Sequence, residues 1–189
     1  MKKIPSLFMR NYDGDRLVRD EVVPGCEWVL TGQGYPTVKW DGTSCLLQDG
    51  KYYRRYDAKH GKTPPPDFMP ACDPDPKTGH WPGWVPVRHD ASDKWHQIGY
   101  ATCGPLPNGT YELIGIGVQG NPYDLNGTVL MKHGEHLLDD VPRDFQGLRD
   151  YLEGNTNIEG IVFHHSDGRA CKLKRKDFGF SWPVKKELV

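Results

Sequence analysis

Short runs of β-forming residues, separated by glycine, dominate the first half of the chain. These runs predict strands at residues 26–30, 37–40, 44–48 and 51–56. The Asp-Gly pair at residues 49–50 is typical of a two-residue hairpin turn. Counting outward from this turn places Leu46 opposite Tyr53 and Ser44 opposite Arg55.

The second half begins with another predicted strand, at residues 110–116, and then contains one clear helical pattern. Asp140 followed by Pro142 is a typical helix start, and Gly154 is a typical helix end. Between them, the apolar residues at positions 145, 148, 151 and 152 share one helical face. An amphipathic helix is therefore predicted between Asp140 and Gly154.

A second hairpin is predicted around the Asp-Gly pair at residues 167–168, with strands at residues 158–164 and 169–174. A two-residue turn there places Phe163 opposite Lys172 and Ile161 opposite Lys174. Alternation along the strands then predicts one common face for Glu159, Ile161, Phe163, Lys172, Lys174 and Lys176.

Residues 57–99 show neither the helical nor the strand period. This stretch holds half of the 16 prolines, but also Trp81, Trp84 and Trp95. Large aromatic residues are unusual in a disordered linker, and long loops in compact domains are often functional. We therefore expect an insertion at about residues 57–99 that packs partly on the body and contacts substrate or acts as a lid.

Length and composition narrow the class of protein. A chain of 189 residues can bury one good core, so we expect a single domain over residues 1–189. The 24 basic and 25 acidic side chains nearly balance, which limits any nucleic-acid partner to a local patch. Five isolated cysteines argue against a disulfide framework and a cysteine zinc site.

No segment approaches the roughly 20 apolar residues that span a bilayer. We expect a cytoplasmic monomer without a membrane partner.

One lysine motif indicates a function only together with the elements that follow it in the sequence. Alone, Lys39-Trp40-Asp41-Gly42 would be typical of a solvated loop. The later elements, in order, are Arg55, Tyr111-Glu112-Leu113, Glu159-Gly160-Ile161-Val162 and Lys172-Leu173-Lys174. This ordered set resembles motifs I, Ia, III, IV and V of the covalent nucleotidyltransferase superfamily, which contains ATP-dependent DNA and RNA ligases and messenger-RNA capping enzymes.

Within that superfamily, the chain resembles the ATP-dependent 5′–3′ RNA ligase family. The likeness rests on residues 80–86, 111–115, 120–123 and 172–179. It implies an α+β fold, the nucleotidyltransferase domain of ligases (an ATP-grasp-like adenylation domain), with antiparallel sheets and flanking helices. It also implies three steps: Lys39 forms lysyl-AMP from ATP, AMP passes to an RNA 5′-phosphate, and an RNA 3′-hydroxyl displaces AMP.

The resemblance also implies a role for each motif residue. A lysine with an ordinary pKa of roughly 10.4 must lose its proton before it attacks phosphorus, so it needs nearby cations or a metal ion. Lys174 would contact the α-phosphate, and Glu112 would bind the ribose hydroxyls. The implied ATP-binding residues are Val38, Arg55, Glu112, Glu159, Ile161, Lys172 and Lys174. Glu159 and Asp41 are the implied ligands of Mg²⁺ or Mn²⁺.

Several of these residues have simpler explanations. Glu112 could form a salt bridge to an arginine, Ile161 and Phe163 could be ordinary core residues, and Asp41 could hold the turn before Gly42. RNA is expected on a basic face, with the insertion's tryptophans as stacking platforms. That face would comprise Arg169, Lys172, Lys174, Arg175 and Lys176.

Three other functions compete with RNA ligation. A DNA ligase or a capping guanylyltransferase would normally carry an additional OB-fold domain, and we expect none here. Ser44 stands where many relatives have an arginine that contacts nucleotide or nucleic acid, which slightly disfavours a DNA ligase. The third alternative is a catalytically silent module that binds RNA or nucleotide.

Overall fold

The structure, a computed structural model, describes residues 4–59 and 61–184 and divides into two compact units. The first, here called the central unit, comprises Asp41–His133. The second, the terminal unit, comprises Ile4–Trp40 and the chain from Gly134 onward. The single-domain organisation stays a prediction.

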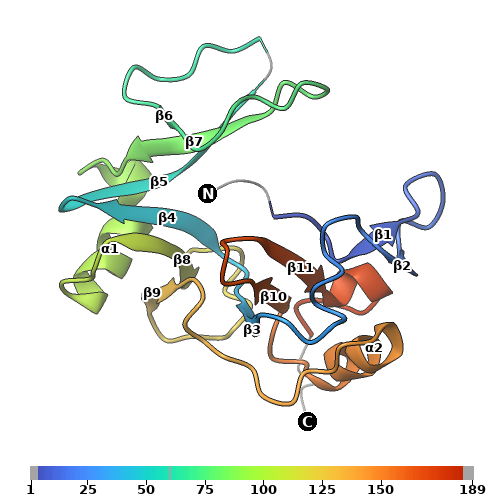
Figure 1. The fold of residues 1–189 in the computed structure, drawn as a ribbon. Helices are drawn as coiled ribbons and strands as arrows, with labels where there is room; N and C mark the ends of the chain where they lie inside the picture. The colour runs from blue at the N-terminus through green and yellow to red at the C-terminus, as the bar shows by residue number, and fades with distance from the viewer. Residues whose placement is uncertain (1–3, 60, 185–189) are drawn as a thin grey trace. The chain divides into compact units, whose positions relative to one another are not determined.

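The central unit is built on an antiparallel six-stranded sheet with the order β6-β7-β5-β4-β8-β9 (Figure 1). Its strands are β4 (Thr43–Gln48), β5 (Lys51–Ala58), β6 (Met69–Pro70), β7 (Trp81–Pro86), β8 (Gly109–Gly115) and β9 (Thr128–Lys132). The short 3₁₀ turn η1 (Ala91–Asp93) leads into helix α1 (Lys94–Cys103), which packs on β8 and β9. Side chains of alternate strand residues, among them Cys45, Leu47, Tyr111 and Leu113, form the core of this unit.

The terminal unit contains two smaller antiparallel sheets, one helix and one 3₁₀ turn. The elements are β1 (Phe8–Arg10), β2 (Val18–Val22), β3 (Tyr35–Lys39), α2 (Phe145–Gly154), β10 (Gly160–His164), β11 (Ala170–Lys174) and η2 (Arg175–Phe178). Strands β1 and β2 pair with each other, and the second sheet has the order β11-β10-β3. Its core gathers buried residues such as Phe8, Leu148, Ile161, Phe163 and Leu173.

The chain is therefore an α+β protein with few helices and antiparallel sheets. No helix of the described residues is long and apolar enough to cross a membrane.

The first predicted hairpin is confirmed where its ladder is formed. Leu46 pairs with Tyr53, as the Asp-Gly turn predicts. The ladder ends at the Cys45–Arg54 pair, one step before the expected Ser44–Arg55 pair.

The predicted register of the second hairpin was wrong by one residue. Phe163 pairs with Cys171 and Ile161 pairs with Leu173. The physical reason is a longer connection: the amide of Gly168 donates to the carbonyl of His165, and His165 and Arg169 close the loop through a 2.8 Å bond. Three residues lie between these two, with Gly168 at φ 88°, which is typical of a turn followed by a glycine bulge.

Two other local predictions were wrong. Residues 26–30 form consecutive turns, because the amides of Val29 and Leu30 donate to carbonyls three residues earlier. Helix α2 is confirmed, but it begins at Phe145. Asp144 caps it by accepting from the amide of Gly147, whereas Asp140 has φ 51°, outside helical geometry.

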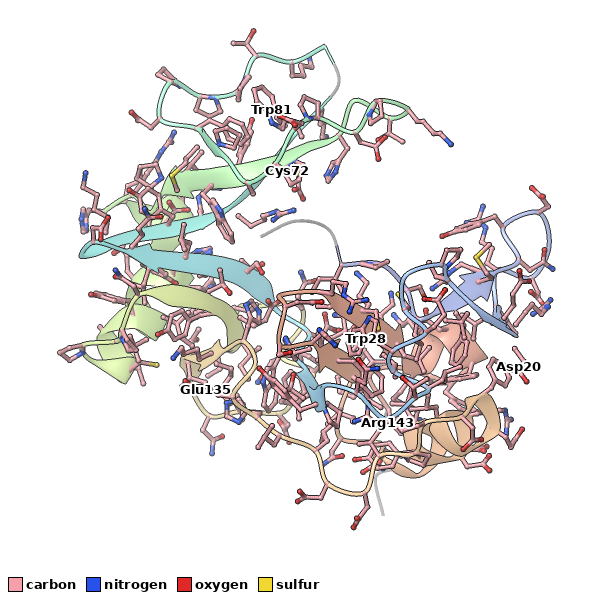
Figure 2. All side chains as sticks on the ribbon, viewed as in Figure 1. Asp20, Trp28, Cys72, Trp81, Glu135 and Arg143 are labelled. Carbon is pink, nitrogen blue, oxygen red and sulfur yellow. The ribbon has the colours of Figure 1, made fainter. Side chains whose placement is uncertain are left out.

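Residues 57–99 are more regular than expected. Strand β7 pairs with β5 along Tyr53–Ala58, and α1 begins at Lys94. The connection before β7 carries the short strand β6. The indole of Trp81, the first residue of β7, donates to the carbonyl of Cys72 in this connection at 2.8 Å (Figure 2). Alternation was hidden because prolines occupy several strand positions, among them Pro82 and Pro86.

Candidate active site

The register of β3, β10 and β11 gathers three lysines on one face of the terminal unit's sheet. Gly160 of β10 pairs with Lys39 on one side and with Lys174 on the other. Val162 pairs with Lys172, and directly opposed residues share a face. Lys39, Lys172 and Lys174 therefore lie together on what we call the lysine face.

The opposite face of the same sheet points into the core. Ile161 and Phe163 are fully buried there, and Val38 packs against the same cluster. The expectation that Ile161 and Phe163 share a face with the lysines was wrong, because the one-residue register change reverses their orientation. Core packing accounts for both side chains, and a contact of Ile161 or Val38 with ATP stays a prediction.

Close approach of β10 and β11 explains why a glycine stands between Lys39 and Lys174. A Cβ atom added to Gly160 would lie 2.2 Å from the carbonyl oxygen of Leu173 and 2.8 Å from the Cα atom of Lys174. Both contacts are shorter than real side chains make, so another residue would push β11 away.

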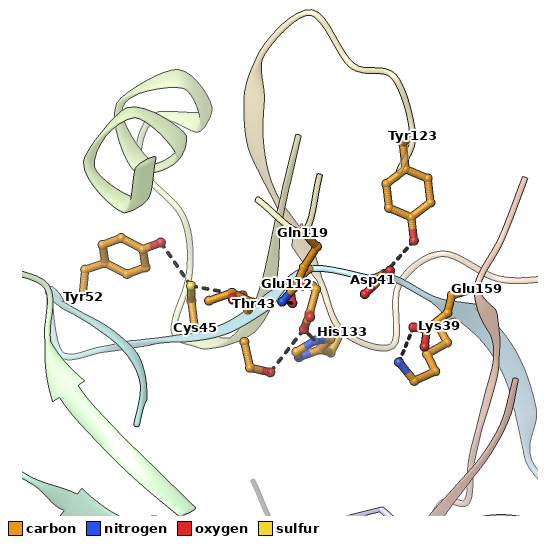
Figure 3. Close-up of polar contacts among 12 residues, drawn as sticks. Lys39, Asp41, Thr43, Cys45, Tyr52, Glu112, Gln119, Tyr123, His133 and Glu159 are labelled. Atoms are coloured by element: carbon orange, nitrogen blue, oxygen red, sulfur yellow. Dashed lines mark hydrogen bonds and ion pairs between the residues drawn. The ribbon is translucent and has the colours of Figure 1, made fainter. Parts of the chain in front are cut away.

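Lys39 forms an ion pair with Glu159, which precedes β10 and lies 120 residues further along the chain (Figure 3). The side chains are 21% and 11% exposed, so both charges are largely removed from bulk water. A carboxylate in such a place requires a cationic partner. Glu159 thus fixes the position of the Lys39 ammonium group.

Lys172 is perturbed by its surroundings. Burial lowers its pKa, and the positive charges of Lys39 and Lys174 lower it further, whereas Glu159 and Asp177 act in the opposite direction. Lys172 therefore gives up its proton more readily than an ordinary lysine does.

The backbone at the end of β11 is held by a buried carboxylate that the sequence patterns had not singled out. Asp177, only 1% exposed, accepts a 2.8 Å hydrogen bond from the amide of Lys174 and forms an ion pair with Arg10. Asp177 lies inside the 172–179 motif, but nothing in the sequence indicates that Arg10 is its partner.

In the central unit, Glu112 of β8 is held by two side chains (Figure 3). One carboxylate oxygen accepts a hydrogen bond from the hydroxyl of Ser44 at 3.2 Å and lies 3.0 Å from Nε2 of His133. Among the described residues, Glu112 does not form the salt bridge to an arginine that was the alternative explanation for it. His133 Nδ1 is buried and has no hydrogen-bond partner among the described residues.

Asp41 and Gly42 are held within the central unit through their backbone. The amide of Asp41 donates to the hydroxyl of Tyr123 at 2.6 Å, and the amide group of Gln119 donates to the carbonyl of Gly42 at 3.4 Å. A Cβ atom on Gly42 would lie 2.1 Å from the carbonyl oxygen of Leu113, so the turn requires glycine. Metal binding by Asp41 stays a prediction.

Arg55 and Arg54 have different surroundings. Arg55 donates to Asp57 at 2.9 Å and lies over the ring of Trp84, 5.6 Å from its centroid. Arg54 forms a 2.8 Å ion pair with the buried Asp93, which is a structural role. A contact of Arg55 with ATP stays a prediction.

Two expectations about RNA contacts meet structural obstacles. Arg175 is 4% exposed and donates to main-chain carbonyls of Leu152 and Asn155, so it does not contribute to an accessible basic face. Trp84 is 3% exposed, so its ring is not open for stacking, whereas Trp95 is half-buried and packs against the core of the central unit.

No group of three or more His, Cys, Asp or Glu residues that could hold a metal ion is present in the part of the chain that the structure describes. Mg²⁺ is commonly bound by one or two carboxylates together with substrate phosphates. The single carboxylate of Glu159 beside the lysine face fits a metal ion that arrives with a nucleotide.

Two comparisons with known proteins find RNA ligases. Residues 97–189 match the RNA ligase 1 family. A curated RNA ligase 1 of Danio rerio is 32% identical over 139 residues, which cover 56% of this chain and 43% of the relative. The RNA ligase 1 proteins of Pongo abelii and Rattus norvegicus are each 31% identical over 141 residues, 57% of this chain and 43% of their own length. The chain is therefore similar to RNA ligase 1 proteins over this region.

The RNA ligase match contains Glu112, Glu159, Lys172 and Lys174, whereas Lys39 lies before residue 97. The matched region spans less than half the length of these RNA ligase 1 relatives.

Proposed function

We propose that the chain is an ATP-dependent RNA ligase that works through a covalent lysyl-AMP intermediate, on the nucleotidyltransferase fold. The observation that supports this proposal most directly is the lysine face. Lys39 forms an ion pair with Glu159, and Lys174 lies on the other side of Gly160 from Lys39. RNA as the substrate is supported by the similarity of residues 97–189 to the RNA ligase 1 family.

In the proposed first step, Lys39 attacks the α-phosphorus of ATP in its neutral amine form. Its ammonium proton leaves to solvent, a P–N bond forms, and the bond between the α-phosphorus and the bridging oxygen breaks to release pyrophosphate. The cations of Lys172 and Lys174 stabilise the negative charge that develops on the phosphate oxygens.

The later steps use the same face. The 5′-phosphate of RNA attacks the lysyl-AMP phosphorus, which frees Lys39 and leaves an RNA capped by AMP. A 3′-hydroxyl then attacks the RNA phosphate, loses its proton and displaces AMP. Mg²⁺ or Mn²⁺ would be held by Glu159 together with phosphate oxygens and would neutralise charge there.

The central-unit residues complete the proposal. Glu112, which His133 and Ser44 orient, would accept hydrogen bonds from the ribose hydroxyls of ATP. Arg55 would contact the nucleotide, and Asp41 would add a carboxylate for the metal ion.

The decisive experiment is incubation with α-labelled ATP and Mg²⁺, followed by a denaturing gel. Native protein should become labelled, whereas Lys39→Ala and the charge-conserving Lys39→Arg should not. Intact-mass measurement beforehand shows whether the protein is already adenylated. Absence of label on protein that carries no AMP would refute the covalent mechanism and favour a silent binding module.

Two panels separate the remaining alternatives. Labelling by GTP in preference to ATP would indicate a capping-type enzyme. Nicked and single-stranded substrates with RNA or DNA strands, each carrying a 5′-phosphate and a 3′-hydroxyl, would distinguish an RNA ligase from a DNA ligase.

A further inference from the structure

The lysine face continues along its strands to an aromatic pair. Tyr35 of β3 and His164 of β10 are direct cross-strand partners. Their rings stack with centroids 5.2 Å apart and planes inclined by 18°. Tyr35 nevertheless keeps 43% of its surface exposed, so its ring is accessible.

The aromatic pair is held in place by a neighbour on the same face and by the chain at Gly134. The hydroxyl of Thr37, a residue only 1% exposed, lies 2.9 Å from Nε2 of His164. A Cβ atom added to Gly134 would lie 3.7 Å from both the Tyr35 hydroxyl and Cε1 of His164, so the chain at Gly134 borders both rings. A ring fixed in this way loses little conformational entropy when a ligand binds to it.

The position of the pair relative to the lysines suggests the ligand. Tyr35 and Lys39 are four residues apart in one strand, which puts them on the same face at a distance of roughly 13 Å. Cations stand at one end of this face and a partly exposed aromatic ring at the other. Proteins bind single-stranded nucleic acid with this combination, in which cations contact the phosphates and rings stack on unpaired bases.

We propose that Tyr35, supported by His164, stacks on a base of the RNA strand whose 5′-phosphate lies at Lys172 and Lys174. The proposal rests on the RNA ligase function argued above. The adenine of ATP is the other source of a base. Lys39 and Lys174 flank Gly160, so a nucleotide on Lys39 and an RNA 5′-phosphate at Lys174 would start from the same end of this face, and the experiment below separates the two sources.

The test measures RNA affinity without ATP, on the full chain and at one fixed salt concentration. The probe is a short single-stranded RNA with a 5′-phosphate and a 3′ fluorophore, and anisotropy gives the dissociation constant. Native protein is compared with Tyr35→Phe, which keeps the ring, and with Tyr35→Ala. Tyr12→Ala is the matched control, because Tyr12 is 72% exposed in the same unit but lies outside the lysine face.

A second probe identifies the base. The measurement is repeated with RNAs that carry an abasic nucleotide at successive positions from the 5′ end. Loss of one stacked base weakens binding by about fivefold or more. We expect this loss for Tyr35→Ala on the intact RNA, and no further loss on the RNA that lacks the base in question. Tyr35→Phe and Tyr12→Ala should bind like native protein.

The outcomes are distinct. Equal affinity of Tyr35→Ala and native protein for intact RNA would overturn the proposal, as would a loss that is unchanged by every abasic position. Weaker ATP binding with RNA binding intact would assign the ring to adenine and also overturn it. Labelling of Lys39 is measured separately, so a failure of the ligase mechanism would be visible independently of this result.

Discussion

Replacement of Asp177 by Asn tests how the end of β11 is held. Asn has the same shape, and its one carbonyl oxygen can still accept the hydrogen bond from the amide of Lys174. Its NH2 group then faces Arg10, so the change removes both the negative charge and the acceptor of that ion pair. Asp177 is 1% exposed, whereas the side chain of Arg10 is 23% exposed and can partly regain water.

Removal of one partner of a buried ion pair typically costs about 3–5 kcal/mol, and the partial exposure of Arg10 argues for the lower end, about 3 kcal/mol. For a chain of this length each kcal/mol lowers the melting temperature by about 2–4 °C. We therefore expect a decrease of about 6–12 °C, and a corresponding loss of free energy of unfolding in urea monitored by circular dichroism.

The matched control is the exposed ion pair of Asp15 and Arg19, whose side chains are 48% and 47% exposed. Asp15→Asn should leave the melting temperature nearly unchanged, because water already solvates both charges. Arg10→Met should be at least as harmful as Asp177→Asn, since it leaves a buried carboxylate unpaired. The double variant should then cost less than the sum. If Asp177→Asn is no more destabilising than Asp15→Asn, the burial argument is incorrect.

Three further changes probe other parts of the terminal unit. Lys172→Met should stabilise the fold near neutral pH, because the pKa of Lys172 is lowered and its protonated form is disfavoured in the folded state. As pH increases from the lowered pKa toward the ordinary 10.5, the free energy of unfolding of native protein should rise relative to that of Lys172→Met. A constant difference between the urea midpoints of the two proteins across that range would contradict a lowered pKa of Lys172. Gly160→Ala should lower the free energy of unfolding by about 1–3 kcal/mol and reduce ATP labelling. Gly154→Ala is the control and should not destabilise the protein, because the space around its Cβ position is open. Equal melting temperatures of the two variants would argue against the close contact between β10 and β11. Asp144→Ala should cost about 0.5–2 kcal/mol through loss of the α2 cap, and unchanged thermal unfolding would show that the cap does not contribute.

The second hairpin shows where sequence patterns reach their limit. Alternation correctly predicted two strands and placed Lys172 and Lys174 on one face, because that relation is local. The turn was expected to hold two residues but holds three, and such a change moves every cross-strand partner by one position. Ile161 consequently lies in the core instead of beside the lysines.

Residues 57–99 illustrate a different limit. A run with prolines at strand positions gives no alternating pattern, yet β7 forms because its partner β5 supplies the pairing. The start of α1 was likewise hidden within a stretch that lacks a clear helical period. Tertiary context decided both elements.

The amino-acid sequence alone determined the β-rich character, helix α2 and the order of the charged motifs, since these depend on residue types and local spacing. It could not place Lys39 beside Glu159, 120 residues away, nor set Lys39 and Lys174 on either side of Gly160. Those contacts, like the pairing of Asp177 with Arg10, follow from which strands meet and in which register. The tertiary structure decides this. Buried charges find their partners, and apolar faces are removed from water, only when segments that are distant in the sequence pack together.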